Sequence, residues 1–398
     1  MPKKSGFALA VILIALVVLL IAGLGLLTLC RHTMLFAIRN VSEITARAAA
    51  DAGLEKALLE LNKKLKAKAI DDGTLPHAAL ENLPNSQESF SYTVTKDTIN
   101  NCYVVESIGK SGSVEKKVKA SLQLQGPFDY ALFTKNYMEL KNGTVVDCPD
   151  CGATGNILQV GTNSTKAASV MMKAGVTVKG DVAVGVGGDP NIVITTKSEA
   201  TITGRTYALA EQNVLTPVTV PSALALLPTE PGINNNTTIT ASGKYDSIHL
   251  GNGEIIKIDG PVALYITNDV VLDNSAQLQI VDAATNPNAS LTLYLGGNLT
   301  CKNGSIINNL TKDPKKLKIF GLDSCKWLTF MTASDFYGAV YTPAAGVRMN
   351  NSVEVFGSIV ADSFIQAVAA GYHYDASLKK VNQTDDLVRF VIQKWFEG

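Results

Sequence analysis

The pattern of hydrophobic and polar positions divides the chain into a helical N-terminal part and a larger part suited to short strands. Residues 7–29 are 23 uncharged, mostly aliphatic residues, and they follow Lys3 and Lys4 closely. Such a run is long enough to cross the ~30 Å hydrocarbon core of a bilayer as one helix. We therefore expect a basic leader at 1–6 and a transmembrane segment at 7–29.

The helix is predicted to continue beyond the membrane. Residues 31–68 contain no proline and one glycine, and they are rich in Ala, Leu, Glu, Lys and Arg, which favour helix. Leucines recur at helical spacing, at Leu54, Leu58, Leu61 and Leu65. We expect residues 30–70 to extend the same helix outside the cytoplasm, with a partner that covers this leucine stripe.

The segment after this helix changes to the alternation that is typical of strands. Residues 70–87 have the composition of a linker, and three strand candidates follow, separated by Asn, Lys, Ser and Gly residues that favour turns. The candidates are Ser89–Thr95, Cys102–Gly109 and Val114–Gln125. They predict a small antiparallel sheet at 88–126 that packs on the helix.

Loosely repeated units fill residues 128–378. The unit at Gly175 is echoed at Ser198, and the unit at Gly253 is echoed at Ser275, so neighbouring units start 23 and 22 residues apart. Short alternating strands, Asn/Gly corners and this period predict a parallel β-helix with an aliphatic core. The fold class is therefore mainly β with one long N-terminal α-helix.

Two segments stand outside this repeat. Residues 211–236 carry four prolines, and proline cannot donate a hydrogen bond to a strand ladder, so this segment is predicted to be a long loop or a strap. Residues 379–398 are predicted to form a C-terminal tail, for which a helical conformation is considered.

The N-terminal residues resemble a known family. A short basic leader that ends in Gly6, then Phe7, then an apolar span that continues into the helix at Ala48–Leu58, resembles the N-terminal segment of PilX-type minor pilins. The resemblance covers about residues 1–65. It implies that prepilin peptidase cleaves after Gly6 and leaves Phe7 as the amino terminus. A cleaved secretory signal and a plain membrane anchor are the competing interpretations.

The second half of the repeat region also resembles a known domain. The segments Gly260–Ile266, Leu293–Leu299, Tyr337–Pro343 and His373–Asp375 are similar to an uncharacterised β-solenoid domain that follows PilX-type helices in bacterial surface proteins. This resemblance covers about residues 240–378. It implies an architecture and no known activity.

One position departs from the pilin pattern. Major pilins carry Glu at the fifth mature position, and here that position is Val11. A carboxylate inside a bilayer is costly and is kept where it has a role, such as pairing with the terminal amine of a neighbouring subunit. Since this chain lacks that group, it is expected to sit where no such neighbour is needed, for example at a fibre tip, or not to assemble.

Composition excludes some functions. The chain has 35 basic and 35 acidic residues, so it offers no net charge for nucleic-acid binding. The glycine-rich stretch at 185–188 lacks the lysine and the helix of a phosphate-binding loop. No cofactor or metal is expected, and the chain is not expected to be an enzyme.

The cysteines offer the clearest candidate chemistry. Cys148 and Cys151 have the spacing of a loop disulfide, a redox pair or half of a zinc site, and a complete zinc site would need a second pair. A disulfide is favoured, with free thiols and a metal left open. Cys301 and Cys325 bracket an irregular, lysine-rich insertion and are a second candidate disulfide.

Two histidines and several charged residues complete the candidates. His249 lies in a predicted strand and is expected to face solvent, and His373 is expected to form a hydrogen-bonded cap on the last coil or part of a polar pocket. Because β-helices also host polysaccharide-degrading enzymes, the charged residues available for catalysis were considered, although their spacing defines no acid/base pair. They are Asp181, Asp189, Asp269, Asp273 and Arg348.

These observations together favour a membrane-anchored, pilin-like structural protein. We expect a minor subunit, at the tip or in assembly, of a type IV pilus or a type II secretion-like fibre. The expected location is the bacterial inner membrane, with the C-terminal domain outside the cytoplasm. The expected partners are the inner membrane, prepilin peptidase, other pilin-like subunits and surface glycans. The alternatives are a surface adhesin that does not polymerise and a polysaccharide-active β-helix enzyme.

Overall fold

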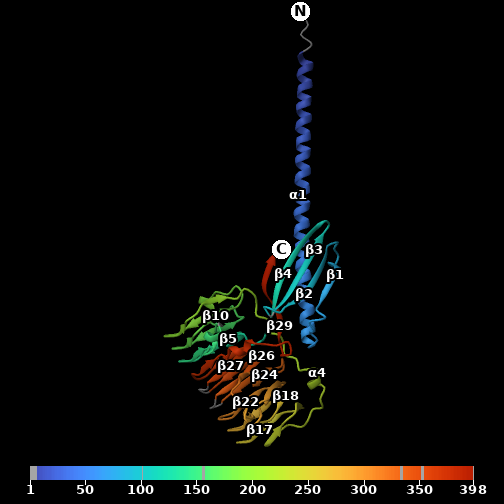
Figure 1. Cartoon of the computed structure of the whole chain (residues 1–398). Coiled ribbons are helices and arrows are strands. Elements are labelled where there is room, and N and C mark those ends of the chain that lie inside the picture. The colour runs from blue at the N-terminus through green and yellow to red at the C-terminus, as the bar shows by residue number, and fades with distance from the viewer. Residues whose placement is uncertain (1–6, 101, 155–156, 332–334, 351–353, 398) are drawn as a thin grey trace, which may run out of the picture. The chain divides into compact units, whose positions relative to one another are not determined.

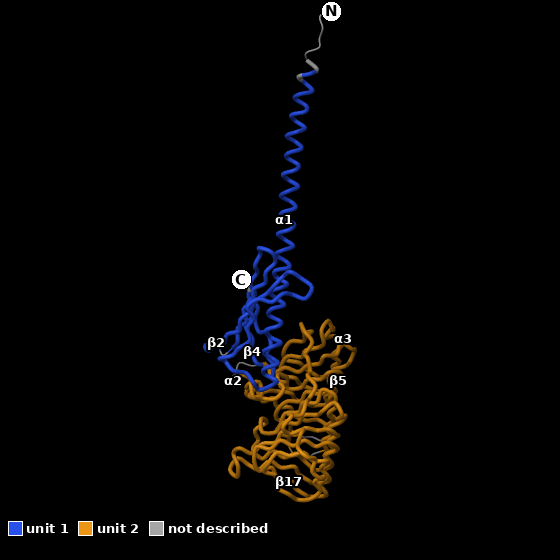
Figure 2. Tube along the Cα trace, turned by 90° about the vertical axis from the view of Figure 1, so that its right-hand side faces the viewer, with its two compact units in different colours: residues 1–124, 388–398 blue, residues 125–387 orange. Residues whose placement is uncertain are grey.

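The computed structural model describes residues 7–100, 102–154, 157–331, 335–350 and 354–397. The chain forms two compact units, which Figure 2 colours separately. The first unit is Met1–Leu124 together with Val388–Gly398, and the second is Gln125–Leu387. Each unit has its own hydrophobic core.

A single helix, α1 (Phe7–Lys66), begins the first unit. Its N-terminal part is apolar and exposed, and by length and composition it can cross a membrane. From Ala46 onward one face of α1 is fully buried, as at Leu54 and Leu61. The change follows the sequence, because the first part is apolar all round whereas the second carries apolar residues only on one side. The predicted unbroken rod is confirmed.

The sheet of the first unit has five strands, in the order β1-β2-β3-β4-β29. Their bounds are β1 (His77–Asn82), β2 (Ser89–Asp97), β3 (Cys102–Ser111), β4 (Val114–Gln125) and β29 (Arg389–Glu397). The three central strands are the predicted antiparallel meander. The outer two were not predicted, since β1 lies in the expected linker and β29 lies in the C-terminal tail.

The helix considered for the C-terminal tail is therefore wrong. Val388, Phe390 and Ile392 all pack against the core of the first unit, which is the two-residue period of a strand. Phe390 is 1% exposed, and its ring meets that of Tyr103 edge to face with centroids 5.0 Å apart. The tail returns to the first unit because these apolar side chains complete its core.

The second unit is a parallel β-helix, as predicted. Gln159 pairs with Asp181, and Gly243 pairs with Leu264, so these neighbouring coils are offset by 22 and 21 residues. The strands that precede the strap are β5 (Leu132–Leu140), β6 (Val145–Asp147), β7 (Gln159–Thr162), β8 (Val170–Met172), β9 (Thr177–Val178), β10 (Asp181–Val184), β11 (Ile194–Thr196), β12 (Thr201–Ile202) and β13 (Thr206–Ala208).

The strands that follow the strap complete the solenoid. They are β14 (Thr237–Ile239), β15 (Gly243–Tyr245), β16 (Ile248–Leu250), β17 (Ile255–Ile258), β18 (Pro261–Ile266), β19 (Val270–Leu272), β20 (Gln277–Ile280), β21 (Ser290–Leu295), β22 (Leu299–Cys301), β23 (Ile306–Asn309), β24 (Leu317–Gly321), β25 (Trp327–Phe330), β26 (Phe336–Met349), β27 (Val355–Gln366) and β28 (Gly371–His373). Short helices interrupt the coils at α2 (Cys151–Thr154), α3 (Pro190–Val193), α4 (Ser222–Ala225), η1 (Pro314–Lys316) and η2 (Ala376–Lys379).

The coils do not stack in the order of the sequence. On one face the strands follow one another as β13, β10, β7, β5, β27, β26, β24, β21, β18 and β15, all parallel. Figure 1 shows this run from β10 through β5 and β27 to β18. The chain thus starts in the middle of the solenoid, builds toward β13, and then resumes at the opposite end near β14.

The proline-rich segment makes this return possible. It covers a row of aromatic side chains on the outside of the solenoid, with its own Val218 and Leu224 buried there. The hydroxyl of Tyr341, on β26, donates to the carbonyl oxygen of Thr216 over 2.8 Å. The segment also contains α4 and two bridges to the end coil, Glu230 to Tyr245 and Ile233 to Ile248. The predicted strap therefore packs along the solenoid.

Candidate functional site

The expected leader junction lies at the start of the helix. Gly6 is outside the described residues, and Phe7 is the first residue of α1. Val11 is 49% exposed and lies in the apolar stretch of α1, of which no described residue is buried. The apolar side chain at the position that is expected to correspond to the acid of major pilins is therefore exposed.

The outer part of α1 is held by very close packing against the sheet. A Cβ atom built on Gly109, in β3, would lie 2.0 Å from the carbonyl oxygen of Ala46 and 2.3 Å from the amide nitrogen of Ala50. Only glycine at this position allows the backbones to approach so closely. Helix and sheet are therefore fixed together as one body, and the exposed apolar part of α1 extends from it.

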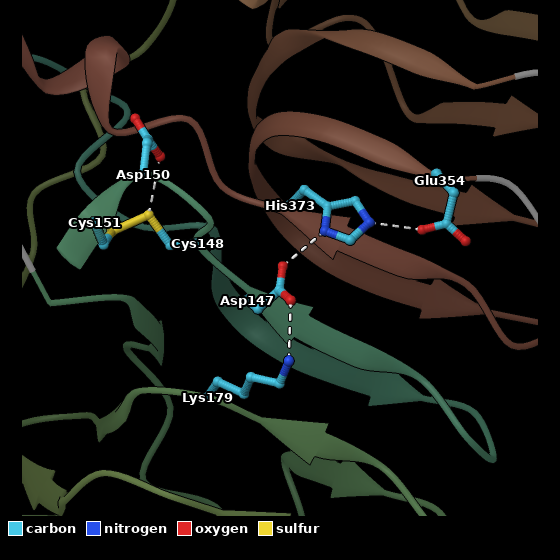
Figure 3. Close-up of polar contacts among 7 residues, drawn as sticks. All are labelled: Asp147, Cys148, Asp150, Cys151, Lys179, Glu354 and His373. Carbon is cyan, nitrogen blue, oxygen red and sulfur yellow. Dashed lines mark hydrogen bonds and ion pairs between the residues drawn. A yellow bond between two sulfur atoms is a disulfide. The ribbon is translucent and has the colours of Figure 1, made fainter. Parts of the chain in front are cut away.

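The Cys148–Cys151 pair forms a disulfide with an S–S distance of 2.02 Å. The two cysteines enclose the turn that follows β6, and Figure 3 shows them beside Asp150. Among the described residues, Cys148, Asp150 and Cys151 are the one group of three or more potential metal-ligating side chains whose ligand atoms lie within 4.8 Å. Sulfur atoms in a disulfide are not thiolates, so this group does not offer the ligands of a zinc site.

The predicted bridge between Cys301 and Cys325 is wrong, because both are free and buried. The register places Cys301 opposite Phe330 of the next coil, and Cys325 comes five residues before Phe330 in the chain. The two thiols therefore do not lie side by side on neighbouring coils. Burial raises the pKa of both thiols to about 12, which makes them poor nucleophiles.

The carboxylates considered for catalysis serve the solenoid itself. Asp181 accepts hydrogen bonds from the backbone and guanidinium of Arg205 on the next coil, and Asp269 accepts one from the amide of Asn298. Asp189 caps α3, and Asp273 pairs with Lys302 and His249. Asp181 and Asp189 lie on one coil and Asp269 and Asp273 on another, and each carboxylate already has a structural partner.

The arginine considered with them also has a structural contact. The guanidinium of Arg348, on β26, lies over the ring of Trp327 at 5.8 Å from its centroid. This is a cation–π contact between neighbouring coils on the outside of the solenoid. The arrangement gives no basis for an acid/base pair at Arg348.

His373 occupies the most connected polar position among these candidates. Its Nδ1 lies 2.7 Å from Oδ1 of Asp147, and its Nε2 lies 2.8 Å from Oε2 of Glu354 (Figure 3). The ring also stacks on that of Phe356, with centroids 4.7 Å apart. Burial alone would lower the pKa of His373, but the two carboxylates outweigh it and raise the pKa above its usual value. These contacts agree with the expected hydrogen bonding, but the expected cap on the last coil is wrong. Because β28 pairs with β6, the last coil lies within the stack and not at an exposed end.

Asp147 and Glu354 were not identified from the sequence. Asp147 is 226 residues from His373, and neither acid belongs to a local motif with the histidine. His249 differs from His373, since it is exposed and meets one carboxylate, that of Asp273, at 3.6 Å. No local sequence pattern distinguishes His373 from His249, because the stacking order of the coils is what brings Asp147, Glu354 and His373 together.

A cavity of about 400 Å³ lies beside η1 and the segment that follows η2. Four lysines and three aspartates line it, so its charges nearly balance. Lys318 pairs with Asp385, and Asp386 accepts a hydrogen bond from Tyr294. The lining therefore does not select a ligand of one charge. Its polar and charged members are Ser290, Asp313, Lys315, Lys316, Lys318, Lys380, Asn382, Asp385 and Asp386.

Comparison with known proteins gives limited similarity. A family model described as a domain of unknown function, DUF7305, matches residues 228–381. This range contains the segment that resembles a surface β-solenoid domain. No curated protein matches the chain.

Solved structures are similar to the chain at low identity. One is the competence-associated pilin ComZ from Thermus thermophilus, at 13% identity and a TM-score of 0.33, covering 90% of this chain and 97% of that chain. A DUF3494 domain of an ice-binding protein from Shewanella frigidimarina has 14% identity and a TM-score of 0.33, covering 62% and 94%. An ice-binding protein from an Antarctic Flavobacteriaceae bacterium has 12% identity and a TM-score of 0.24, covering 62% and 96%. Similarity at this level does not define a function.

Proposed function

We propose that the protein is a pilin-like structural subunit, anchored in the inner membrane by α1, that displays the β-helix outside the cytoplasm. The observation that carries this proposal is the construction of α1. One unbroken helix of 60 residues is exposed and apolar at its start and buried under an antiparallel sheet at its end. A cleavable secretory signal does not need to continue into the core of a folded domain.

The length of the exposed apolar part supports assembly with other helices. The exposed residues extend from Leu9 to Ile44, which is roughly 54 Å at ~1.5 Å per residue, whereas a bilayer core needs about 30 Å. Beyond the bilayer length, Leu35, Val41 and Ile44 are still more than half exposed. Large apolar surfaces of this kind mark contact sites, and the helices of other pilin-like subunits are the partners that fit.

Val11 supports a position at or near the tip. In a growing fibre, the acid of each added subunit would neutralise the amino terminus of the subunit ahead of it, in a low-dielectric surround where the attraction is strong. A first subunit has no subunit ahead, so an apolar side chain costs it nothing. A minor subunit of this kind would also place one large solenoid on each fibre, so copies of the solenoid would not crowd one another along a narrow shaft.

The chemistry of the solenoid supports a structural role rather than a catalytic one. Asp181, Asp269 and Asp273 are bound to neighbouring coils, Asp189 caps α3, and the two buried thiols have raised pKa values. Contact with surface glycans is part of the proposal for the displayed solenoid, and binding to prepilin peptidase is part of the proposal for the leader.

The test is immunogold labelling of sheared fibres with subunit counting. The proposal predicts rare labels concentrated at fibre ends. Uniform labelling at a ratio near that of the major pilin would exclude a tip position, and absence from fibres would favour a surface adhesin that does not polymerise. The variant Val11→Glu should increase incorporation along the shaft, because it restores the docking acid. Ile12→Glu is the matched control, since it places the same charge one residue away.

A further inference from the structure

The first and the last coil in sequence order lie side by side in the middle of the solenoid. The contact between them is not covalent. The first coil contributes β5 and β6, and the last coil contributes β27 and β28. Ile359 lies opposite Leu132, and His373 lies opposite Asp147. We use the term seam for the contacts of β5 and β6 with β27 and β28. The strap connects the block of coils before it to the block after it. Among the described strands, those of the two blocks pair with each other only at the seam.

Polar side chains reinforce the seam. The hydroxyl of Tyr374 donates to the carbonyl oxygen of Phe128 over 2.6 Å, and the carboxylate of Asp150 accepts from the amide of Ala376 at 3.2 to 3.3 Å. The disulfide that encloses Asp150 holds this acceptor in place. Each of these contacts joins a residue near the start of the solenoid to one near its end.

The geometry at His373 requires a particular protonation state. Both ring nitrogens lie within hydrogen-bond distance of carboxylate oxygens, at 2.7 and 2.8 Å. An ionised carboxylate only accepts hydrogen bonds, and a neutral imidazole has only one N–H. Both contacts therefore form at the same time only when the ring is the doubly protonated cation.

We propose that the seam is a pH-sensitive clasp, in which the protonated ring of His373 ties the last coil to Asp147 of the first coil and to Glu354 of its neighbour, and loosens on losing a proton. Among the described residues, Asp147 and Glu354 are the charged groups in direct contact with the ring. Lys179, from the coil beyond β6, reaches the other oxygen of Asp147 at 3.2 Å. After the His373 ring loses a proton, Lys179 still neutralises Asp147, but the ring can then donate a hydrogen bond to only one of the two carboxylates.

The direction of the effect follows from linkage. Because the pKa of His373 is raised in the folded chain, its stabilising contribution is complete below the usual pKa of histidine and is lost as the pH rises through the folded value. The ring is 22% exposed and Asp147 is 20% exposed, so solvent screens this contact less than that of a surface ion pair, whereas Glu354 is 49% exposed and its contact is screened more. The clasp is therefore tight in mildly acidic surroundings and looser in alkaline ones.

The test is amide hydrogen exchange on the full chain in detergent micelles, followed by mass spectrometry at about pH 5.5 and about pH 8.5. Rates are converted to protection factors, which removes the intrinsic effect of pH on exchange. The expected result is a severalfold lower protection of β6 and β28 at the higher pH, with the strands β18 and β21 unchanged. His373→Gln should abolish this difference, because glutamine does not titrate.

Two further variants distinguish a clasp from a merely structural contact. Glu354→Gln removes one carboxylate from an exposed position, so the loss of protection should begin at a lower pH. His249→Gln is the matched control. It should leave the seam unchanged because the His249 ring pairs with Asp273, and both residues lie on coils that do not belong to the seam. Equal protection of β28 at both pH values in the unmodified chain, or the same pH dependence in His373→Gln, would overturn the proposal.

Discussion

Asn62 and Phe390 are 328 residues apart, and the side chain of Asn62 forms two hydrogen bonds with the backbone of Phe390. Its Oδ1 accepts from the amide nitrogen of Phe390 at 2.7 Å, and its Nδ2 donates to the carbonyl oxygen at 3.2 Å. The amide side chain thus substitutes for a strand partner. This pair ties the C-terminal strand to the N-terminal helix and explains why both ends of the chain belong to the first unit.

The first prediction concerns Asn62. Asn62→Ala should destabilise the first unit by about 1–3 kcal/mol, because the amide and carbonyl groups of Phe390 lose their partner. Urea unfolding monitored by hydrogen exchange in β29 measures the effect. Asn40→Ala is the control, since Asn40 is exposed on the same helix. Equal stability of the two variants would show that the pair does not hold the strand.

The second prediction concerns the close approach of helix and sheet. Gly109→Ala should destabilise the first unit by about 1–3 kcal/mol, because the added methyl group would overlap the backbone of α1 at Ala46 and Ala50. Thermal unfolding of the full chain gives the measurement. In the control Gly73→Ala, the added atom meets nothing closer than 3.5 Å. An unchanged melting temperature for Gly109→Ala would contradict this packing.

Local patterns predicted the elements better than their partners. The leucine stripe and the coil period were sufficient for α1 and the β-helix, because both are set by side chains close in sequence. Apolar residues alternate along β29 and the residue before it, at Val388, Phe390 and Ile392, but the partner strand β4 lies more than 260 residues earlier. The stacking order of the coils could not be predicted from the sequence either. A repeat indicates where each coil begins and ends, but not which other coil it stacks on.

The third prediction separates the cysteines by reactivity. Alkylation of the native chain without reduction should leave all four cysteines of the second unit unlabelled, because two are in a disulfide and two are buried. Unfolding without reduction should expose Cys301 and Cys325 only, and reduction should then add Cys148 and Cys151. Mass spectrometry of tryptic peptides reads each step. Labelling of Cys148 or Cys151 before reduction would contradict the disulfide.

The fourth prediction is an acid dependence that originates at Asp181. Burial alone would raise its pKa, but the amide and guanidinium of Arg205 outweigh it and lower the pKa below its usual value. A lowered folded pKa means that the stabilisation is complete above the unfolded pKa and is lost as the pH falls through the folded one. The β10–β13 contact should therefore weaken in acid.

The variant Asp181→Asn should flatten this acid dependence, and hydrogen exchange across β10 and β13 between about pH 5 and about pH 3 measures it. Asp323→Asn is the control, because Asp323 is an exposed aspartate on another coil. If both variants keep the acid dependence of the unmodified chain, Asp181 is not its source.

The candidate site was predictable only in part. Cys148 and Cys151 were identified because a disulfide across a short turn depends on local spacing. Cys301 and Cys325 were paired wrongly, because sequence distance does not reveal that the register sets Cys301 opposite Phe330. The partners of His373 come from the first coil and from the coil before its own, and no local pattern in the sequence connects the three residues.

The fifth prediction tests whether α1 is a pilin-like helix or a plain membrane anchor. The mature amino terminus should be determined by mass spectrometry on protein from cells with active prepilin peptidase. We expect a chain that begins at Phe7, and a Gly6→Ala variant that accumulates uncleaved. Protein that begins at Met1 in such cells, or at a residue beyond Leu29, would contradict this expectation.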